Sequence, residues 1–352
     1  MADVYERLAK HLDNLPAGYP ATDSGIEIKI LKHLFTPEEA ETTIALTMLL
    51  EPAGDVAKKL GKDEPDVEKL LYSMSEKGLI FRSGKGGKNK YMAAQFVVGI
   101  WEYNVNNLNE ELIRDVNEYI PQLLEGWKKH KTKQIRVIPV SESIPTEMNI
   151  MPYEQAENII KKQSKILVAP CICRKEHNMI GGGCDRPSET CLIFGGSAFF
   201  YEENGIGRSV SQEEAVEILH KGIEAGLVLQ PSNSQKPYVI CMCCGCCCQI
   251  LKNLNKLDEP ANFAYTNHYV TVSDDDCTGC GSCEDICPMD AINVEDDLAV
   301  VNMARCIGCA LCHTRCEFDA INLVEKEESE KLPIPGNTVE TYMIMAQERG
   351  LL

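Results

Sequence analysis

No cysteine occurs before Cys171 in this 352-residue chain, although 18 cysteines follow from that position onward. Aromatic residues make up only 6%, so aliphatic side chains must fill most of the core. No run approaches the roughly 18 apolar residues of a membrane-spanning helix. Residues 1–10 contain neither an apolar signal core nor a twin-arginine pair. These absences predict a cytoplasmic chain without a membrane span.

Basic charge is also scarce, because 35 Lys and Arg residues face 53 Asp and Glu residues and leave a net charge of −18. Residues 271–352 hold 17 acidic and five basic residues, and so carry most of this excess. Such a surface does not attract the phosphates of nucleic acid or of anionic lipid. It can steer the chain toward a basic patch on a protein partner.

The cysteines do not suit a disulfide scaffold, because disulfide-dense domains are small and secreted. Clustered cysteines in a cytoplasmic chain of this length favour metal binding instead. So many oxidisable thiols further indicate an anaerobic, strongly reducing cell.

Residues 1–130 show helix signals followed by a hairpin signal. Thr36-Pro37-Glu38-Glu39 is a capping box with proline at the first helical position, which predicts a helix from Thr36 to about Leu50. Further helices are expected over 54–60, 65–77 and 109–129, the last one broken near Pro121, and a hairpin is expected over 79–93. Three helices followed by a hairpin resemble a winged helix-turn-helix.

A winged helix raises the alternative of a redox-sensing transcription regulator. The expected wing is basic, with Arg82, Lys85, Lys88 and Lys90. The expected recognition helix, however, carries Asp66, Glu68 and Glu76 and lacks the Arg, Asn or Gln side chains that read base edges. We therefore expect this domain to dock on protein, and DNA binding is disfavoured.

Residues 131–265 mix strand and helix signals around ten cysteines. We expect strands over 134–140 and 165–169 and helices over 152–162 and 211–226. Together they predict a cysteine-rich α+β domain. The tail after Glu325 is acidic and is expected to end in a short helix over 339–348.

Two runs of cysteines occupy residues 266–325. Each run spaces three cysteines two residues apart and places a fourth after three more; the runs are Cys277, Cys280, Cys283, Cys287 and Cys306, Cys309, Cys312, Cys316. Pro288 follows the first run, and Glu317 takes the equivalent place after the second. Ala-Ile recurs after each run, at 291–292 and 320–321, which indicates an internal duplication. Four-cysteine zinc sites more often have two separated pairs, so zinc knuckles are the disfavoured alternative.

Both runs resemble those of bacterial-type two-cluster ferredoxins. In that pattern the fourth cysteine of each run ligates the other 4Fe–4S cluster. One cluster would then take Cys277, Cys280, Cys283 and Cys316, and its mate Cys306, Cys309, Cys312 and Cys287. Gly279, Gly281 and Gly308 are expected to let the backbone approach cluster sulfurs. The carboxylate of Glu317 should lower the potential of the nearby cluster. The fold class is thus α+β, with a winged-helix-like domain (1–130), a cysteine-rich domain (131–265), a ferredoxin-like module (266–325) and an acidic tail (326–352).

Ten middle-domain cysteines are candidate ligands of one or two further iron–sulfur clusters: Cys171, Cys173, Cys184, Cys191, Cys241, Cys243, Cys244, Cys246, Cys247 and Cys248. Neighbouring residues on an extended chain point in opposite directions, so the dense string 241–248 should serve two sites. The favoured partition gives one cluster most of the first four cysteines and the other cluster four of the six in the string, although ligands mixed between the halves are equally open. Zinc or a redox-active dithiol is the alternative. Arg174, His177 and Arg186 are candidate tuning residues or proton donors.

Cys243-Cys244-Gly245 is similar to a motif of the heterodisulfide reductases, but it occurs once and with different spacing. Over its full length the chain resembles a family of cytosolic 4Fe–4S binding-domain proteins from anaerobes. That resemblance rests on Leu34 to Ala40, Ala169 to Arg174, Leu229 to Asn233 and the cysteine motifs. It implies electron transfer beside larger flavin or disulfide-reductase machinery.

The expected function is single-electron relay between a donor and a larger redox enzyme, with a flavoenzyme or reductase complex as partner. The alternatives to this relay are a disulfide-type reductase built on the middle domain and the redox-sensing transcription regulator. No catalytic residue can be assigned, and no nucleotide, flavin or nicotinamide fingerprint is found.

Overall fold

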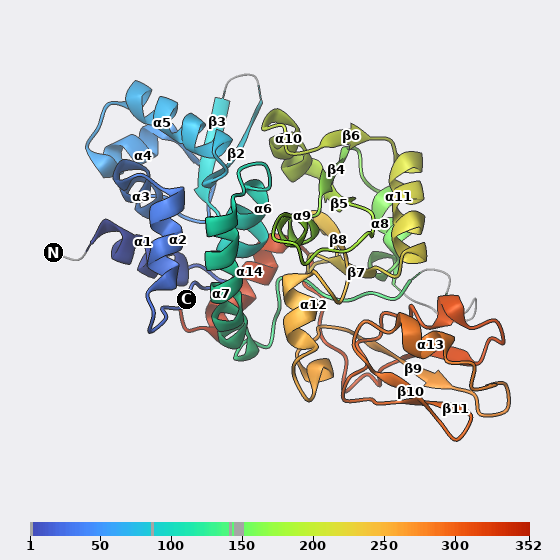
Figure 1. Cartoon of the computed structure of the whole chain (residues 1–352). Coiled ribbons are helices and arrows are strands. Elements are labelled where there is room, and N and C mark those ends of the chain that lie inside the picture. Colours follow the sequence, from blue (N-terminus) through green and yellow to red (C-terminus); the bar gives the residue numbers. More distant parts are fainter. Residues whose placement is uncertain (1–2, 86–87, 141–142, 144–150) are drawn as a thin grey trace. The chain divides into compact units, whose positions relative to one another are not determined.

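The computed structural model describes residues 3–85, 88–140, 143 and 151–352. The described part of the chain contains both helices and antiparallel strands, as expected for an α+β protein (Figure 1). The chain divides into two compact units. The first unit comprises Met1–Lys131, Gly196–Gly207 and Tyr342–Leu352, and the second comprises Thr132–Gly195 and Arg208–Thr341. The middle segment and the cysteine runs therefore share one unit.

The first unit is mainly helical. Its helices are α1 (Val4–Asp13), α2 (Ile26–Leu34), α3 (Pro37–Ile44), α4 (Ala53–Leu60), α5 (Glu64–Glu76), α6 (Trp101–Tyr103), α7 (Glu110–Lys128) and most of α10 (Gly195–Glu203), with a π-helical turn at Phe96–Ile100. Strands β1 (Glu51–Pro52), β2 (Ile80–Lys85) and β3 (Lys88–Ala93) form an antiparallel sheet in the order β1-β3-β2. The expected hairpin is thus present, and its strands extend into the polar stretch.

The capping box at Thr36 is confirmed, but the helix it opens is shorter than expected. Thr36 Oγ1 accepts from the Glu39 N–H at 3.3 Å, and a Glu39 carboxylate oxygen accepts from the Thr36 N–H at 2.8 Å. The helix ends at Ile44 rather than near Leu50. Beyond that end, the Thr47 carbonyl accepts from the Ala93 N–H at 2.8 Å. Pairing with the hairpin therefore replaces the next helical turn.

The expected break at Pro121 is wrong, because α7 runs unbroken through this proline. Pro121 is exposed, whereas Val116, Tyr119, Ile120 and Leu123 on the buried face of the helix flank it on both sides. Burial of this continuous apolar face outweighs the loss of one backbone hydrogen bond at the proline.

Arg82 differs from Lys88 and Lys90 of the expected wing, which are exposed, because its own side chain is only 3% exposed. Its guanidinium lies 4.2 Å from the centroid of the Tyr72 ring. It donates to Ser75 Oγ at 2.5 Å and pairs with Glu203 at 3.0 Å. This side chain holds the hairpin to its own unit and is not available to a nucleic-acid phosphate.

The second unit is built on an antiparallel five-stranded sheet in the order β6-β4-β5-β8-β7. Its strands are β4 (Ile166–Pro170), β5 (Glu189–Phe194), β6 (Arg208–Val210), β7 (Val228–Pro231) and β8 (Val239–Cys243), and its helices include α8 (Ala156–Lys161), α9 (Ile172–Met179), α11 (Gln212–Glu224) and α12 (Gln249–Leu254). Helices α8 and α11 lie side by side against the sheet (Figure 1).

Two expectations in this unit need correction. Residues 134–140 form no strand; they make only isolated bridges from Ile135 to Ser232 and from Ile138 to Leu229. The helix expected over 152–162 is a 3-10 turn at Pro152–Glu154 followed by α8. The capped helix at Ser211 is confirmed, since Ser211 Oγ accepts from the Glu214 N–H at 3.2 Å.

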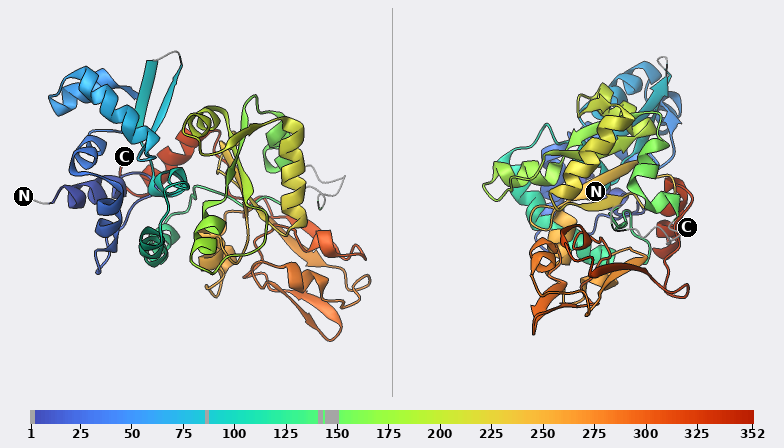
Figure 2. Two further views of the ribbon diagram at one scale, coloured as in Figure 1. Left: turned by 45° about the horizontal axis from the view of Figure 1, so that its top comes forward. Right: turned by 90° about the vertical axis from the view of Figure 1, so that its right-hand side faces the viewer.

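The C-terminal cysteine module, residues 266–325, pairs β9 (His268–Val272) with β12 (Ile321–Glu325) and β10 (Ile292–Glu295) with β11 (Leu298–Val301). Helix α13 (Ser282–Ile286) and a 3-10 turn at His313–Arg315 carry parts of the two runs. The orange strands of this module group together in both views of Figure 2. One buried core joins Ile240 and Met242 of the sheet to Val270 and Ile307 of the module.

The tail ends in α14 (Thr338–Glu348), close to the expected 339–348. No helix in the described part of the chain combines the length and apolar character needed to cross a membrane.

Replacing Arg82 by Met should destabilise the first unit by about 2 to 3 kcal/mol, because charged hydrogen bonds and a cation–π contact are lost together. Unfolding in urea, followed by tryptophan fluorescence, reports on this unit because both tryptophans, Trp101 and Trp127, belong to it. The exposed Lys88 on the neighbouring strand gives the matched control, Lys88→Met, with an expected change below about 0.5 kcal/mol. Equal effects of the two substitutions would contradict the structural role of Arg82.

Candidate metal centres

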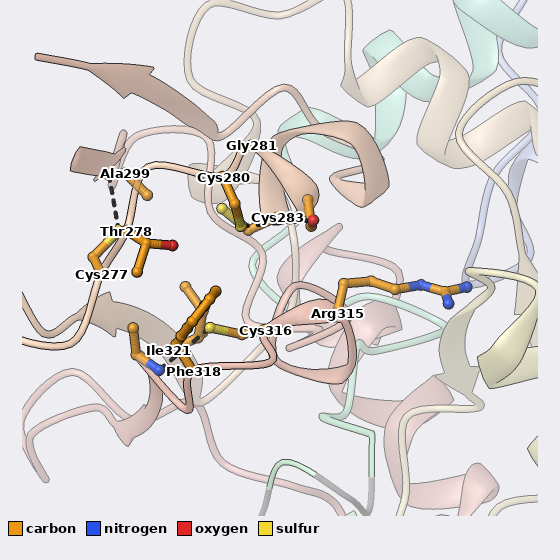
Figure 3. Close-up of a pocket in the computed structure, with 12 residues that line it drawn as sticks. Cys277, Thr278, Cys280, Gly281, Cys283, Ala299, Arg315, Cys316, Phe318 and Ile321 are labelled. Atoms are coloured by element: carbon orange, nitrogen blue, oxygen red, sulfur yellow. Dashed lines mark hydrogen bonds between the residues drawn. The ribbon is translucent and has the colours of Figure 1, made fainter. Parts of the chain in front are cut away.

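The first centre is a cavity of ≈ 330 Å³, including the part open to solvent, lined by the thiols of Cys277, Cys280, Cys283 and Cys316. Three of these residues come from the first run, and Cys316 comes from the second. Figure 3 shows their side chains around a common space, with the Arg315 guanidinium pointing away. That guanidinium donates to the Glu224 carbonyl at 2.6 Å instead.

A second cavity, of ≈ 320 Å³ measured in the same way, is lined by Cys306, Cys309, Cys312 and Cys287. Here the second run supplies three thiols, and the first run supplies Cys287. Cys309 and Cys312 are buried, whereas Cys280 at the first cavity is exposed. The structure thus places the fourth cysteine of each run beside the first three of the other.

Backbone N–H groups point at three of these sulfurs. The Ala291 N–H donates to Cys287 Sγ at 3.3 Å, and the Ala320 N–H donates to Cys316 Sγ at 3.3 Å. The repeated Ala-Ile pairs therefore perform the same task in the two halves. A third bond runs from the Ala299 N–H to Cys277 Sγ at 3.4 Å. Such donors stabilise charge on a ligating sulfur and raise the potential of the group it holds.

Burial raises the pKa of the Cys283, Cys287, Cys309 and Cys312 thiols. The backbone N–H and then the hydroxyl of Ser282 lower the pKa of exposed Cys280. Because thiolates are the form that binds metal, occupancy of these buried positions must release protons.

A family model described as "4Fe-4S binding domain" matches residues 270–293, which contain the whole first run. The chain is an iron–sulfur protein. No curated protein and no solved structure matches it in the comparisons made. This iron–sulfur protein carries the matched segment on β9, α13 and the start of β10. The residues present fit a 4Fe–4S group, because four thiols surround a cavity with few competing polar atoms.

Two glycines of the module lie close to neighbouring backbone. A Cβ on Gly279 would overlap the Asp297 carbonyl oxygen, and a Cβ on Gly308 would overlap that of His268. Close packing of backbone segments is therefore one reason for glycine at these two positions, and the expected approach to cluster sulfurs stays a prediction. At Gly281 no atom lies within 4 Å of an added Cβ, so only its φ of +81° demands glycine.

Replacing Gly308 by Ala should destabilise the module by about 3 kcal/mol or more, because backbone overlap adds to the left-handed strain. Gly281→Ala, the matched control, should cost only about 1 to 2 kcal/mol of strain. The urea concentration at which the visible iron–sulfur absorbance is lost ranks the two variants under anaerobic conditions. If Gly308→Ala keeps its visible absorbance to the same urea concentration as Gly281→Ala, or to a higher one, the close approach to His268 is refuted.

In the middle segment, the structure brings together the thiols of Cys184, Cys244, Cys246 and Cys247, whose Sγ atoms all lie within 4.8 Å of one another. We call these residues the four-thiol group. Cys247 Sγ lies 3.7 Å from Cys184 Sγ and 3.8 Å from Cys246 Sγ. The favoured partition, which drew one cluster from most of the first four middle cysteines and the other from four of the string, does not match this grouping, which mixes the two halves. Adjacent Cys246 and Cys247 both belong to the group, so strict alternation does not describe the string.

Two arginines contact the four-thiol group. Arg186 Nη1 donates to Cys246 Sγ at 3.4 Å, and its Nε donates to the Ala225 carbonyl at 3.0 Å. Arg174 is 1% exposed; it donates to Cys244 Sγ at 3.7 Å and to the Met242 carbonyl at 3.3 Å. Both arginines were candidates from the sequence, and the structure gives them sulfur acceptors.

Of the other string thiols, Cys248 contacts Cys173 and Cys243, and Cys173 also contacts Cys171. A hydrogen bond from the Cys173 thiol lowers the pKa of Cys171 to about 7. Hydrogen bonds from Cys173 and Cys243 lower the pKa of Cys248 well below its usual value. Cys241 contacts Cys243, and it lies opposite Cys191 in the β5–β8 register.

His177 and its neighbours form a buried polar network one helical turn from Cys173. His177 Nδ1 lies 2.8 Å from the Cys173 carbonyl, and its Nε2 lies 3.0 Å from Lys252 Nζ. Glu176 is fully buried and accepts from Gln249 Nε2 at 2.6 Å. Burial raises the pKa of Glu176. The sequence did not single out Glu176 or Gln249, because they meet only when α9 and α12 pack together.

His268 was also missed. Its side chain is fully buried, and neither ring nitrogen has a hydrogen-bond partner in the structure. Burial lowers its pKa to about 4, so the imidazole is neutral at physiological pH. His268 lies on β9 two residues before Val270, which lines the second cavity. Because alternate residues share a face of a strand, His268 and Val270 lie on the same face.

Proposed function

We propose that this iron–sulfur protein is an electron-transfer protein or subunit whose C-terminal cysteine module holds two 4Fe–4S clusters. Single electrons would pass through them between a donor and a larger redox enzyme. The observation that supports this is the pair of cavities, each lined by three thiols of one run and the fourth of the other. Crossed ligation of two adjacent clusters requires this arrangement.

The first cavity is suited to exchange electrons with a partner. Cys280 at its edge is exposed, and the Phe318 side chain is 48% exposed there. The nearby Asp274, Asp275 and Asp276 and, on the second run, Glu317 are exposed carboxylates. They would steer a basic patch of the partner toward this opening. We propose a flavoenzyme or a reductase complex in the cytoplasm of an anaerobe as that partner.

The second cavity lies against the middle domain. Pro288, which lines this cavity, packs so closely on the string that a Cβ on Gly245 would lie 2.8 Å from the Pro288 carbonyl oxygen. Gly245 separates Cys244 from Cys246 of the four-thiol group. Thiol centres of the middle domain and of the module are therefore neighbours in one unit, which supports a connected series of redox sites with one or two further centres beyond the module.

The first unit would serve as a docking domain of the winged-helix type. Its helices α3 to α5 and the sheet β1-β3-β2 follow one another as expected for that fold. Reading of DNA is disfavoured because α5 exposes Asp66 and Glu76, and because Arg82 of the expected wing is buried.

The alternative, a disulfide-type reductase, has one specific observation in its favour. Six middle thiols, Cys171, Cys173, Cys191, Cys241, Cys243 and Cys248, lie outside the four-thiol group. A cubane with four cysteine ligands would leave two of them free for thiol chemistry. Alkylation of the reduced, anaerobic chain tests this: complete protection of all six thiols removes the basis of the alternative.

Crossed ligation predicts how single-ligand variants pair. Cys316→Ala should lose the same cluster as Cys277→Ala, and Cys287→Ala the same cluster as Cys306→Ala, because each fourth cysteine serves the other run. Each variant should lose about four of the roughly eight iron atoms that two cubanes contain. Iron and acid-labile sulfide analysis of the anaerobically purified chain gives the count, and electron paramagnetic resonance of the reduced protein identifies the cluster that remains.

In the reduced wild-type chain, magnetic interaction between two adjacent clusters should broaden the spectrum, and each variant should show the simple spectrum of one cluster. Fewer than about eight iron atoms in the wild-type chain would contradict the proposal. A spectrum of Cys316→Ala matching that of Cys306→Ala would show that each run holds its own cluster.

A further inference from the structure

We propose that the four-thiol group, Cys184, Cys244, Cys246 and Cys247, binds one tetrahedral divalent metal ion, Zn²⁺ or Fe²⁺, rather than an iron–sulfur cubane. This site lies outside the C-terminal cysteine module and is independent of the electron-transfer function proposed for it.

The spacing of the sulfurs matches a single ion. Four thiolates at about 2.3 Å from a central ion form a tetrahedron with edges of roughly 3.8 Å. The Cys247 sulfur lies 3.7 Å from that of Cys184 and 3.8 Å from that of Cys246, and all four sulfurs lie within 4.8 Å of one another. A cubane places iron and sulfide atoms between its thiolates, so its ligands must stand farther apart.

The module provides an internal comparison. Its two sets of four thiols surround cavities of ≈ 330 Å³ and ≈ 320 Å³. Among the residues that the structure describes, the four-thiol group alone brings its metal-binding side chains within 4.8 Å of one another. The thiols of the module are thus more widely spaced than those of the four-thiol group.

The local sequence explains the tight convergence. Three of the thiols come from one turn between β8 and α12, and Cys184 comes from the glycine-rich loop between α9 and β5. Cys246 is exposed, whereas Cys244 and Cys247 are buried. Four thiolates fill a tetrahedral shell and leave no position for substrate, which is the pattern of a structural or electron-carrying ion rather than of a catalytic one.

The charges around the four-thiol group fit a bound metal–thiolate site. A divalent ion with four thiolates carries a net charge of −2, and two arginines donate to its sulfurs, Arg186 to Cys246 at 3.4 Å and Arg174 to Cys244 at 3.7 Å. Arg174 is almost fully buried, so an anionic acceptor beside it compensates the cost of burying its charge. The two guanidinium groups, each with a charge of +1, balance the net charge of −2 at the site.

The ion would fasten two segments far apart in the sequence. Cys184 belongs to a loop whose Arg186 also bonds the Ala225 carbonyl, and Gly245 of the string packs on Pro288 of the module. Binding at the four-thiol group would therefore hold the loop and the string in place beside the second cavity.

Metal analysis of the full chain tests the proposal. In anaerobically purified protein, Cys184→Ser and Cys246→Ser should each lose one zinc or one iron per chain and no acid-labile sulfide. Asp185→Asn, an exposed neighbour of Cys184, is the matched control and should keep the wild-type metal content. Loss of about four iron atoms with equal sulfide would identify a cubane and overturn the proposal; unchanged metal content would overturn it as well.

The wild-type chain provides a second test that does not depend on the folding of a variant. X-ray absorption at the zinc edge should show four sulfur neighbours at about 2.3 Å, or, if the ion is iron, Mössbauer spectra should contain a mononuclear tetrathiolate component. A wild-type chain with no zinc and with all its iron in clusters would refute the site. Acid-labile sulfide content separates the two proposals, because the clusters of the module contain sulfide and the proposed single-ion site does not.

Discussion

Thiols that converge from distant segments organise the second unit of this protein. The thiols around the first cavity come from the first run, up to Cys283 in α13, and from Cys316, more than 30 residues further along the chain. In the middle domain, Cys184 joins a turn that begins at Cys244. Four thiols in contact bind little to one another, whereas metal–thiolate bonds are strong enough to make folding depend on the metal.

The surrounding chain is adapted to these sulfurs. Backbone N–H groups of Ala291 and Ala320 donate to the fourth cysteine of each run, and guanidinium groups of Arg174 and Arg186 donate to the four-thiol group. The module places neutral backbone donors at its sulfurs. The middle domain places guanidinium cations at its sulfurs, and these offset the net charge of −2 that four thiolates around one divalent ion carry.

The two units divide the work differently. The first unit contains no cysteine, packs around aliphatic and tyrosine side chains, and holds its hairpin with the buried Arg82. The second joins its five-stranded sheet and the C-terminal cysteine module through one continuous core. Because the thiol centres share this core, their spacing is set by packing rather than by a flexible linker, which suits electron transfer between them.

The sequence alone determined the features that depend on local spacing. The cysteine runs, the capping box at Thr36, the N-cap at Ser211, and the helix ending at Gly61 follow from residues a few positions apart. The match to a 4Fe-4S binding domain over 270–293 lies in such a segment.

Only the tertiary structure decided which distant groups meet. It placed Cys184 with Cys244, turned Arg82 inward, kept α7 continuous through Pro121 and left residues 134–140 without a strand partner beyond isolated bridges. Each outcome depends on packing between segments, and a spacing pattern contains no information about that. Eighteen cysteines can be counted in the sequence, but the size of the site that four of them form is fixed only by the fold.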